Sequence, residues 1–366
     1  MHRAPRSTLL FLLALTGACS QSVKPTPATT AVLAPAMLAP AGASVQPTAM
    51  VASSAAPAAS DPALDAGKKA AFIAEAAKFS GMAPTEIRAW LGKARYQQSI
   101  INAISRPAEG KPWRDYRPIF LTDTRIQQGR KFYAEHRSEL QRISAQTGVP
   151  AEIIVAIIGV ETNYGRIGGS YRVLDALYTL GFFFPRREEF FRSELMQLFA
   201  LAREEHLDLA TLKGSYAGAM GWGQFMPSSY RQYGRDGDGD GRRDLLGSAR
   251  DAFASIASYF VGYGWQSGQP AFVPAVADVG AAPFVPEDFV AKYSLAELAA
   301  RGYRPANAGA PNLPATLLTL QGANGPEYWI GYKNFYVITR YNRSPMYAMA
   351  VYQLAQEIAA GAATAP

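Results

Sequence analysis

One uninterrupted apolar segment constrains the fold of this chain more than any other feature. Pro150 suits the first turn of a helix, and it is followed by AEIIVAIIGVE, in which Ile153 to Val160 carry no charge. We therefore predict a helix that begins at Pro150 and ends at Glu161. Such a helix needs a hydrophobic core around it, and the composition allows one, because 49% of the 366 residues are hydrophobic and 18% are charged.

Glu161 is the ionisable group at the end of this segment. A carboxyl group in an apolar setting loses hydration when it ionises, so its pKa rises, and it can then give a proton to a leaving-group oxygen near neutral pH. The alternative is a helix-end glutamate that faces solvent or pairs with a residue such as Arg166, and by spacing alone that role is the commoner one. We find no second carboxyl group in a comparably apolar setting.

The rest of the body has the pattern of a mainly α (α+β) protein. Apolar residues recur at helical spacing in further segments, which predict helices over 68–79, from Pro84, and over 123–147, 171–180, 187–206, 251–263 and 345–359. Short β-like pieces separated by Gly, Pro and Asn follow, at 272–276, 315–320, 327–332 and 335–341, interrupted by a helical piece at 294–302.

The N-terminus has the pattern of a secretion signal. Arg3 and Arg6 precede the apolar stretch 8–15, which is too short to span a membrane in the mature protein, and the stretch T-G-A-C then ends at Cys19. This arrangement resembles a bacterial lipoprotein signal. The resemblance implies cleavage before Cys19 and lipidation of that cysteine, and Ser20 favours sorting to the outer membrane. The alternative is a plain signal peptide with an incidental cysteine.

A tether is predicted after the signal. Residues 20–65 are rich in Ala, Pro, Ser and Thr and almost free of charge, so they cannot bury enough surface to offset their chain entropy. We expect them to be disordered and extended, and to join the membrane to the folded body. No other segment of the sequence has the length and apolarity to span a bilayer.

Cysteine, histidine and charge narrow the class of protein. Cys19 is the only cysteine, which excludes an intrachain disulfide and any cysteine-based metal site or nucleophile in the body. The three histidines, His2, His136 and His206, argue against a zinc site. The net charge of +7 favours an acidic partner, but the absence of a run of five or more Lys or Arg argues against nucleic acid.

The segment KGSYAGAMGWGQFMPSSY, residues 213–230, is glycine-rich and aromatic, with hardly any charge. Glycine lets the backbone approach a ligand closely. Ser215 and Gln224 could hydrogen-bond to polar groups of a ligand, and Phe225 could cover the face of a ligand ring. The alternative is a tight turn between helices, packed by its aromatic residues.

The segment DGDGDGRRDLLG has the alternating acidic pattern of a calcium-binding loop. Asp236, Asp238 and Asp240 occupy its first, third and fifth positions, where side chains bind the ion, and a glycine occupies the sixth. Arg242 is at the seventh position, where the backbone oxygen is the ligand. Gly247 stands where the usual closing Glu would be. The alternative is a solvated acidic turn. A single loop favours a structural ion over a sensor.

Three blocks, VETNYG, GSYAGAMGWGQFMPSSY and ITRYN, resemble the membrane-bound lytic murein transglycosylase B family, and the likeness runs from about residue 70 to 357. The resemblance implies a lysozyme-like helical core with an additional helical region and a small β-containing insertion. It also implies non-hydrolytic cleavage of the β-1,4 bond between N-acetylmuramic acid and N-acetylglucosamine. The muramyl 6-hydroxyl attacks in this reaction and leaves a 1,6-anhydro end.

In that chemistry one carboxyl group suffices, whereas most glycosidases need two. The resemblance implies that Glu161 first protonates the glycosidic oxygen and then, as a carboxylate, deprotonates the 6-hydroxyl. The 2-acetamido group of the substrate stabilises the anomeric cation in between. The resemblance implies no cofactor for catalysis.

The resemblance also assigns residues to the site. It implies that Ser215 and Gln224 contact N-acetyl or hydroxyl groups of the substrate and that Phe225 covers the face of a sugar ring. Two arginines that could meet peptide or lactyl carboxylates match as well, Arg186 and Arg187. Further matches to cleft positions are Tyr116, Tyr259, Tyr341, Asn342 and Tyr347.

For the acidic loop, the family closes a longer loop with an Asp at the start of the next helix. Asp251 matches that residue, and Asp244 is the competing candidate. We expect a structural Ca²⁺ held by Asp236, Asp238, Asp240, Arg242 and Asp251.

Together these features predict the organisation of the chain. Residues 1–19 form a lipoprotein-type signal, 20–65 the tether and 66–366 the catalytic body. The body divides into a helical region (66–150), a lysozyme-like core (151–268) with the calcium loop at 236–251, a β-containing region (269–340) and a C-terminal helix returning to the core (341–366).

We expect a periplasmic monomer, anchored to the inner leaflet of the outer membrane through Cys19, that acts on peptidoglycan and binds no nucleic acid. The sequence does not identify a cell-wall synthase partner. Two other functions stay open: a lysozyme-type hydrolase on the same fold, and a non-catalytic glycan-binding lipoprotein that needs no general acid.

Overall fold

The structure is a computed structural model that describes residues 64–105 and 111–362. These residues belong to one compact unit. The predicted signal peptide with Cys19, and nearly all of the predicted tether, lie outside the described residues. The described part is mainly helical with two small sheets, which confirms the predicted fold class.

The helices that precede the predicted carboxyl-bearing segment are α1 (Ala66–Ser80), α2 (Pro84–Lys93), α3 (Gln98–Ile104), α4 (Trp113–Phe120), α5 (Asp123–Glu135) and α6 (Arg137–Thr147). The helices that follow are α7 (Ala151–Thr162), α8 (Val173–Phe183), the short 3₁₀ helix η1 (Pro185–Arg187), α9 (Glu188–Glu204), α10 (Pro227–Tyr233), α11 (Ala249–Gly262), α12 (Leu295–Ala300), α13 (Lys333–Tyr341) and α14 (Pro345–Ala362). The strands are β1 (Tyr171–Arg172), β2 (Lys213–Gly214), β3 (Phe272–Ala277), β4 (Tyr303–Pro305), β5 (Thr316–Gly322) and β6 (Gly325–Gly331).

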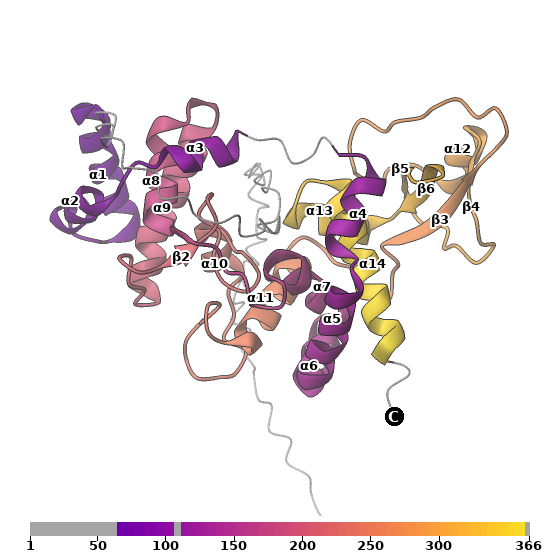
Figure 1. The fold of residues 1–366 in the computed structure, drawn as a ribbon, viewed down its shortest axis with the longest axis horizontal. Helices are drawn as coiled ribbons and strands as arrows, with labels where there is room; N and C mark the ends of the chain where they lie inside the picture. Colours follow the sequence, from indigo (N-terminus) through magenta and orange to yellow (C-terminus); the bar gives the residue numbers. More distant parts are fainter. Residues whose placement is uncertain (1–63, 106–110, 363–366) are drawn as a thin grey trace, which may run out of the picture. The chain divides into compact units, whose positions relative to one another are not determined.

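Helix α7 lies among α5, α11 and α14 (Figure 1), and its residues belong to the main hydrophobic core. Eleven of its 12 residues are buried, as expected for a helix that is apolar on every side. Helices α5 and α6 precede it in the chain and α11 and α14 follow it, and all four pack against it. The predicted apolar helix is therefore confirmed. Segments from both halves of the body close the core around it.

The ring of Tyr164 packs across the last turns of α7 and leaves no room for a side chain at Gly159. Asn163 and Tyr164 have left-handed backbones, with φ of 48° and 61°, and they end the helix. The Tyr164 hydroxyl donates to the backbone oxygen of Arg125 at 2.9 Å. This bond holds the ring so close to α7 that a Cβ on Gly159 would lie 2.7–2.8 Å from its atoms.

The β-containing region has a sheet and a hydrophobic cluster of its own. Its four strands are antiparallel in the order β4-β3-β6-β5, and they are seen with α12 on the right of Figure 1. The cluster consists of Leu298, Tyr303, Ala315, Leu317, Ile330 and Tyr332. Three of the predicted β pieces are confirmed as β3, β5 and β6, and the predicted helical piece is α12.

The fourth predicted β piece, residues 335–341, is wrong, because this segment lies in α13. Its β-branched and aromatic residues favour a strand by propensity. However, Phe335, Ile338 and Tyr341 recur at helical spacing and are all buried. Packing of this face into the core overrides the local preference, as tertiary contacts commonly do.

The predicted single helix over 123–147 is instead two helices, α5 and α6. They are divided at His136, whose φ of −112° and ψ of 16° leave the helical range. The His136 ring lies 4.6 Å from the ring of Phe132 and 5.3 Å from that of Phe253. The break allows the two halves to contact different neighbours, since α5 packs on α14 and α6 on α11.

Within residues 64–105 and 111–362, no single helix has both the length and the apolarity to cross a membrane. Helices α6 and α7 taken together are long and apolar enough, but their axes are bent by 114° at the junction between them.

We predict that Gly159→Ala destabilises the protein, although alanine is the better helix former. The propensity gain is ~1 kcal/mol, whereas forcing a methyl group against a packed ring costs ~1–3 kcal/mol. Equilibrium unfolding in urea measures the net change. Gly92→Ala in α2 is the matched control, because nothing lies within 4 Å of its added Cβ, and it should gain up to ~1 kcal/mol. Equal stability of the two variants would refute this account of Gly159.

Candidate active site

Glu161 is a buried acid in the last turn of α7. Its side chain is 7% exposed, and its Oε1 accepts a hydrogen bond of 2.6 Å from the Tyr347 hydroxyl. Burial raises the pKa of Glu161 to about 7, and the hydrogen bond from Tyr347 opposes this rise. The predicted apolar setting is confirmed, and the carboxyl group can exchange a proton near neutral pH.

Three of the tyrosines predicted for the cleft meet near this carboxyl group. Tyr347 comes from α14 and Tyr341 from the end of α13, and both are buried. Burial raises the pKa of each tyrosine, and the charge of Glu161 raises both further. Tyr116, from α4, is close enough to Tyr347 to raise its pKa as well. The site is thus assembled from elements on both sides of α7 in the sequence.

An aromatic cluster continues from Tyr341. The ring centroids of Phe225, Tyr259 and Tyr341 lie 4.8–6.0 Å apart in each pairing. The Tyr259 hydroxyl donates to the backbone oxygen of Arg340 at 2.6 Å. Asn342, which follows Tyr341, is buried too. Phe225 packs edge-on against both tyrosine rings and is 3% exposed. Its role in covering a sugar remains a prediction.

The segment between β2 and α10 is held in a tight turn by two of the predicted ligand-binding residues. The Ser215 hydroxyl oxygen accepts the backbone N–H groups of Ala217 and Ala219 at 3.2 and 3.1 Å. Gln224 has a left-handed backbone, with φ of 50°. Its side-chain nitrogen donates to the backbone oxygen of Gly221 at 3.0 Å. Both residues therefore shape the turn, whatever they bind.

The two predicted arginines lie in η1. Arg186 is exposed, and the Arg187 guanidinium lies 4.3 Å from the ring centroid of Phe190. Burial lowers the pKa of Arg187, the charge of Glu194 opposes this, and Arg343 lowers it further. Their contact with substrate stays a prediction.

The expectation that Glu161 is the only carboxyl group in an apolar setting is wrong. Glu194 of α9 is 3% exposed, and burial raises its pKa. Its two oxygens accept the backbone N–H of Ser228 at 2.9 Å and the Ser228 hydroxyl at 2.6 Å. Residues adjacent in sequence do not surround Glu194 with apolar side chains; tertiary packing does. The only sequence signal of its burial is the helical spacing of Phe191, Leu195 and Leu198 around it.

The acidic loop gathers three of its predicted ligands. Carboxylate oxygens of Asp236, Asp238 and Asp251 all lie within 4.8 Å of one another. Asp240 instead accepts the backbone N–H of Arg242 at 2.8 Å. Asp244 accepts the backbone N–H groups of the two residues before Ser248, at 3.0 and 2.8 Å. The geometry therefore favours Asp251 over Asp244 as the closing residue.

These three carboxylates suit a hard divalent cation. Asp251 is 1% exposed. Burial raises its pKa, two backbone hydrogen bonds oppose this, and the charge of Asp238 raises it again. A cation among the three groups would offset both the desolvation of Asp251 and the mutual repulsion.

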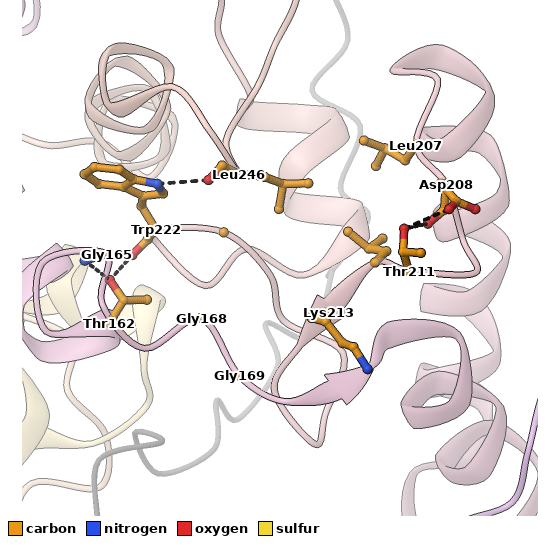
Figure 2. A pocket seen from close by; sticks show the side chains of 12 residues that line it. Thr162, Gly165, Gly168, Gly169, Leu207, Asp208, Thr211, Lys213, Trp222 and Leu246 are labelled. Atoms are coloured by element: carbon orange, nitrogen blue, oxygen red, sulfur yellow. Dashed lines mark hydrogen bonds between the residues drawn. The ribbon is translucent and has the colours of Figure 1, made fainter.

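A pocket opens beside the last turn of α7 (Figure 2). Thr162, which follows Glu161, lines one side together with Trp222, and Leu207 and Thr211 lie across from them. Glu161 is not among the described residues that line this pocket. The pocket therefore adjoins the turn that carries the acid without containing the carboxyl group.

The comparisons with known proteins agree with this geometry. The family model described as "Transglycosylase SLT domain" matches residues 65–356. This chain belongs to that family. It is 48% identical over 247 residues to the membrane-bound lytic murein transglycosylase B of Escherichia coli (strain K12), a match that covers 68% of this chain and 67% of that protein.

Solved structures of lytic transglycosylases have the same fold. The soluble lytic transglycosylase SltB1 from Pseudomonas aeruginosa is 49% identical with a TM-score of 0.76, over 81% of this chain and all of the other. The Escherichia coli lytic transglycosylase Slt35 in complex with calcium is 43% identical with a TM-score of 0.74, over 80% of this chain and 93% of that one. The predicted lytic murein transglycosylase class and its lysozyme-like core are confirmed.

We predict that the stability cost of Glu161 depends on pH. Its pKa is about 7 in the folded protein and near the ordinary 4.5 in the unfolded chain, so the unfolded state loses its proton first as pH rises. This lowers the free energy of unfolding between these two values, by at most about 3 kcal/mol. Glu161→Gln, which keeps an oxygen for Tyr347, should escape the loss.

Urea unfolding at pH 5 and pH 8 measures this effect. The stability of Glu161→Gln relative to the unmodified protein should rise from the lower to the higher pH. Glu189→Gln, at an exposed position of α9, is the matched control and should show no such trend. A constant difference for Glu161→Gln would mean that Glu161 ionises normally in the fold.

Proposed function

We propose that this enzyme cleaves the β-1,4 bond between N-acetylmuramic acid and N-acetylglucosamine of peptidoglycan without water, leaving a 1,6-anhydro end. The observation that carries the proposal is the buried Glu161 carboxyl group, with a pKa of about 7 and one oxygen bonded to Tyr347. An acid poised near the working pH can both give and take a proton. Membership of the transglycosylase SLT family supports the same reaction.

The hydrogen bond from Tyr347 distinguishes the two carboxyl oxygens of Glu161. Because Oε1 accepts the Tyr347 proton, Oε2 is the oxygen that carries the acidic proton. Oε2 gives this proton to the glycosidic oxygen as the C–O bond breaks, and the substrate's 2-acetamido oxygen stabilises the anomeric carbon as an oxazolinium. The ionised carboxylate then takes the proton of the muramyl 6-hydroxyl. That oxygen attacks the anomeric carbon, displaces the acetamido oxygen and closes the anhydro ring.

The other buried carboxylates have different tasks. Glu194 uses both oxygens to hold Ser228, and Asp251 belongs to the acidic cluster. Asp175 accepts the backbone N–H of Arg95 at 2.8 Å and the side-chain amide of Gln97 at 3.1 Å. A two-carboxylate hydrolase would need a second such group free to activate water. This contrast favours the transglycosylase over the lysozyme-type hydrolase. The Pseudomonas aeruginosa relative SltB3, 31% identical with a TM-score of 0.70, has been crystallised with NAG-anhNAM-pentapeptide, which carries an anhydro end.

Substrate contacts are proposed for the residues around the carboxyl group. Ser215, Gln224 and Phe225 would contact the sugar rings and their N-acetyl groups. Arg186 and Arg187 would meet peptide or lactyl carboxylates. The remaining proposed cleft residues are Tyr116, Tyr259, Tyr341, Asn342 and Tyr347.

The location we propose is the periplasm, with a lipid on Cys19 that anchors the enzyme to the outer membrane. The similar Escherichia coli protein is named membrane-bound, which supports an anchor. A lipid and a tether of residues 20–65 would allow the catalytic body to reach the wall from the membrane surface.

We further propose that the acidic loop holds a structural Ca²⁺ through Asp236, Asp238 and Asp251, with Asp240 and the backbone oxygen of Arg242 completing the site. The proximity of three carboxylates supports this, and the similar Slt35 was crystallised in complex with calcium.

We predict that the enzyme releases muropeptides with 1,6-anhydro ends from purified sacculi, and that Glu161→Gln lowers the rate of release by about 10²- to 10⁴-fold. Mass spectrometry of the products measures both. Glu189→Gln, an exposed change on α9, should leave release unchanged. Reducing ends, which are one water heavier, would identify a hydrolase. Binding of sacculi without any release would identify a glycan-binding protein.

The pH dependence of release should follow the same carboxyl group. General-acid catalysis needs protonated Glu161, so kcat/KM on free enzyme should fall as pH rises through about 7. A rate that stays constant up to pH 9 would show that another group donates the proton.

We predict that calcium raises the melting temperature of the dialysed protein by binding the folded state. Asp251→Asn should abolish this increase, whereas Asp244→Asn should retain it. An unchanged melting temperature after addition of a chelator would rule out the structural ion, and the reverse ranking of the two variants would assign Asp244 as the closing ligand.

A further inference from the structure

Trp222 is bonded to two parts of the molecule that the proposed function treats separately. Its backbone N–H donates to the backbone oxygen of Leu245 at 3.1 Å, and its indole N–H donates to that of Leu246 at 2.9 Å. Its own backbone oxygen accepts the Thr162 hydroxyl at 2.9 Å (Figure 2). Trp222 thus joins the C-terminal half of the acidic loop to the end of the helix that carries Glu161.

The ring of Trp222 is also packed against the turn that follows α7. Gly165 has a φ of +78°, and a Cβ there would lie 3.2–3.3 Å from atoms of the indole. The Thr162 hydroxyl oxygen accepts the backbone N–H of Gly165 at 3.0 Å. A displacement of Trp222 would therefore press directly on Thr162 and Gly165.

On the side of the acidic loop, the positions of Leu245 and Leu246 depend on the carboxylate cluster. Asp251 accepts the backbone N–H of Asp244 at 2.6 Å. Asp244 in turn accepts the backbone N–H of Leu246 at 3.0 Å. Asp251 is also one of the three carboxylates gathered within 4.8 Å. A change in the spacing of these carboxylates would therefore move the backbone oxygens of Leu245 and Leu246, which accept hydrogen bonds from Trp222.

On the side of the active site, Trp222 has a second route to Glu161. The backbone oxygen of Gly223 accepts the Tyr341 hydroxyl at 2.6 Å, and Tyr341 is close enough to Glu161 to be affected by its charge. Two residues next to Glu161 are therefore bonded to this segment: Thr162, which follows it in sequence, to Trp222, and Tyr341 to Gly223.

We propose that Trp222 is a positioning residue that transmits the state of the acidic loop to the Glu161 carboxyl group, so that calcium increases turnover as well as stability. The proposal rests on the roles proposed above for Glu161 and for the loop. Without a cation, the three carboxylates repel one another, and the loop from Asp244 to Leu246 shifts with Asp251. Trp222 follows its acceptors, and the end of α7 follows Trp222.

The test uses calcium itself as the probe, on the full-length protein dialysed against chelator. The variants are Trp222→Phe, which loses the indole donor to Leu246, and Thr162→Val, which loses the hydroxyl donor to Trp222. Calorimetry measures calcium affinity. Turnover on soluble glycan strands, with and without calcium and well below the melting temperature, gives kcat and KM separately. Tryptophan fluorescence provides a readout that does not depend on activity.

The matched control is Trp265→Phe. Its indole N–H also donates to a backbone oxygen, that of Gly148 at 3.0 Å, so the same type of bond is lost. Trp265 is not bonded to the acidic loop through this contact. It should retain both the calcium-dependent gain in kcat and the calcium-dependent change in fluorescence.

The expected result is a rise in kcat of roughly tenfold with calcium in the unmodified enzyme, since small misplacements of catalytic groups have effects of this size or larger. Trp222→Phe and Thr162→Val should bind calcium with unchanged affinity but lose this gain in kcat, with KM little altered. The calcium-dependent fluorescence change should be absent in Trp222→Phe.

Three results would overturn the proposal. They are an unmodified enzyme whose kcat is unaffected by calcium, a Trp222→Phe variant that keeps the full gain, and a Trp265→Phe control that loses it. None of these touches the proposed reaction, which is tested separately by the inactivity of Glu161→Gln in the same assay.

Discussion

The contact between the Glu161 carboxyl group and the Tyr347 hydroxyl is the interaction on which the site depends. It forms at the end of a helix in which eleven of 12 residues are buried, and both Glu161 and Tyr347 are buried. In such surroundings a hydrogen bond fixes the orientation of an acid more firmly than it would at a surface. The pKa of about 7 follows from the opposition of burial and this one bond. Removing either contribution would move the acid away from its working range.

Holding a protonatable group in a core costs stability, and the fold offsets this cost in several places. Helices α5, α6, α11 and α14 surround α7 with apolar side chains. Other buried carboxylates have partners, as Glu194 has Ser228 and Asp251 has two backbone N–H groups. Glu161 differs from Glu194, because only one of its oxygens is occupied by a bond that the structure describes. The second oxygen of this carboxyl group thus has no bond that the structure describes, as the proposed reaction requires.

The features that could be predicted from the sequence were those whose cause is local. The burial of Glu161 follows from the apolar residues directly before it, and the acidic loop follows from alternating aspartates. Tyr347 stands 186 residues from Glu161, and only the likeness of motifs indicated it. Glu194 was missed because its burial comes from packing against α10. The strand expected at residues 335–341 and the unbroken helix at 123–147 failed for the same reason, since tertiary contacts decided both.

The pairing of Glu161 with a residue of the last helix has a consequence for how the enzyme is made. A chain emerges from the ribosome from its N-terminus, so α7 appears long before α14. Until α14 docks, Glu161 lacks Tyr347 and one wall of its core, because α14 packs directly on α7. The Glu161–Tyr347 contact therefore forms only when nearly the whole body has been synthesised and folded. An incomplete chain that lacks α14 also lacks this contact, so its Glu161 carboxyl group has neither the hydrogen bond nor the full burial that set its pKa.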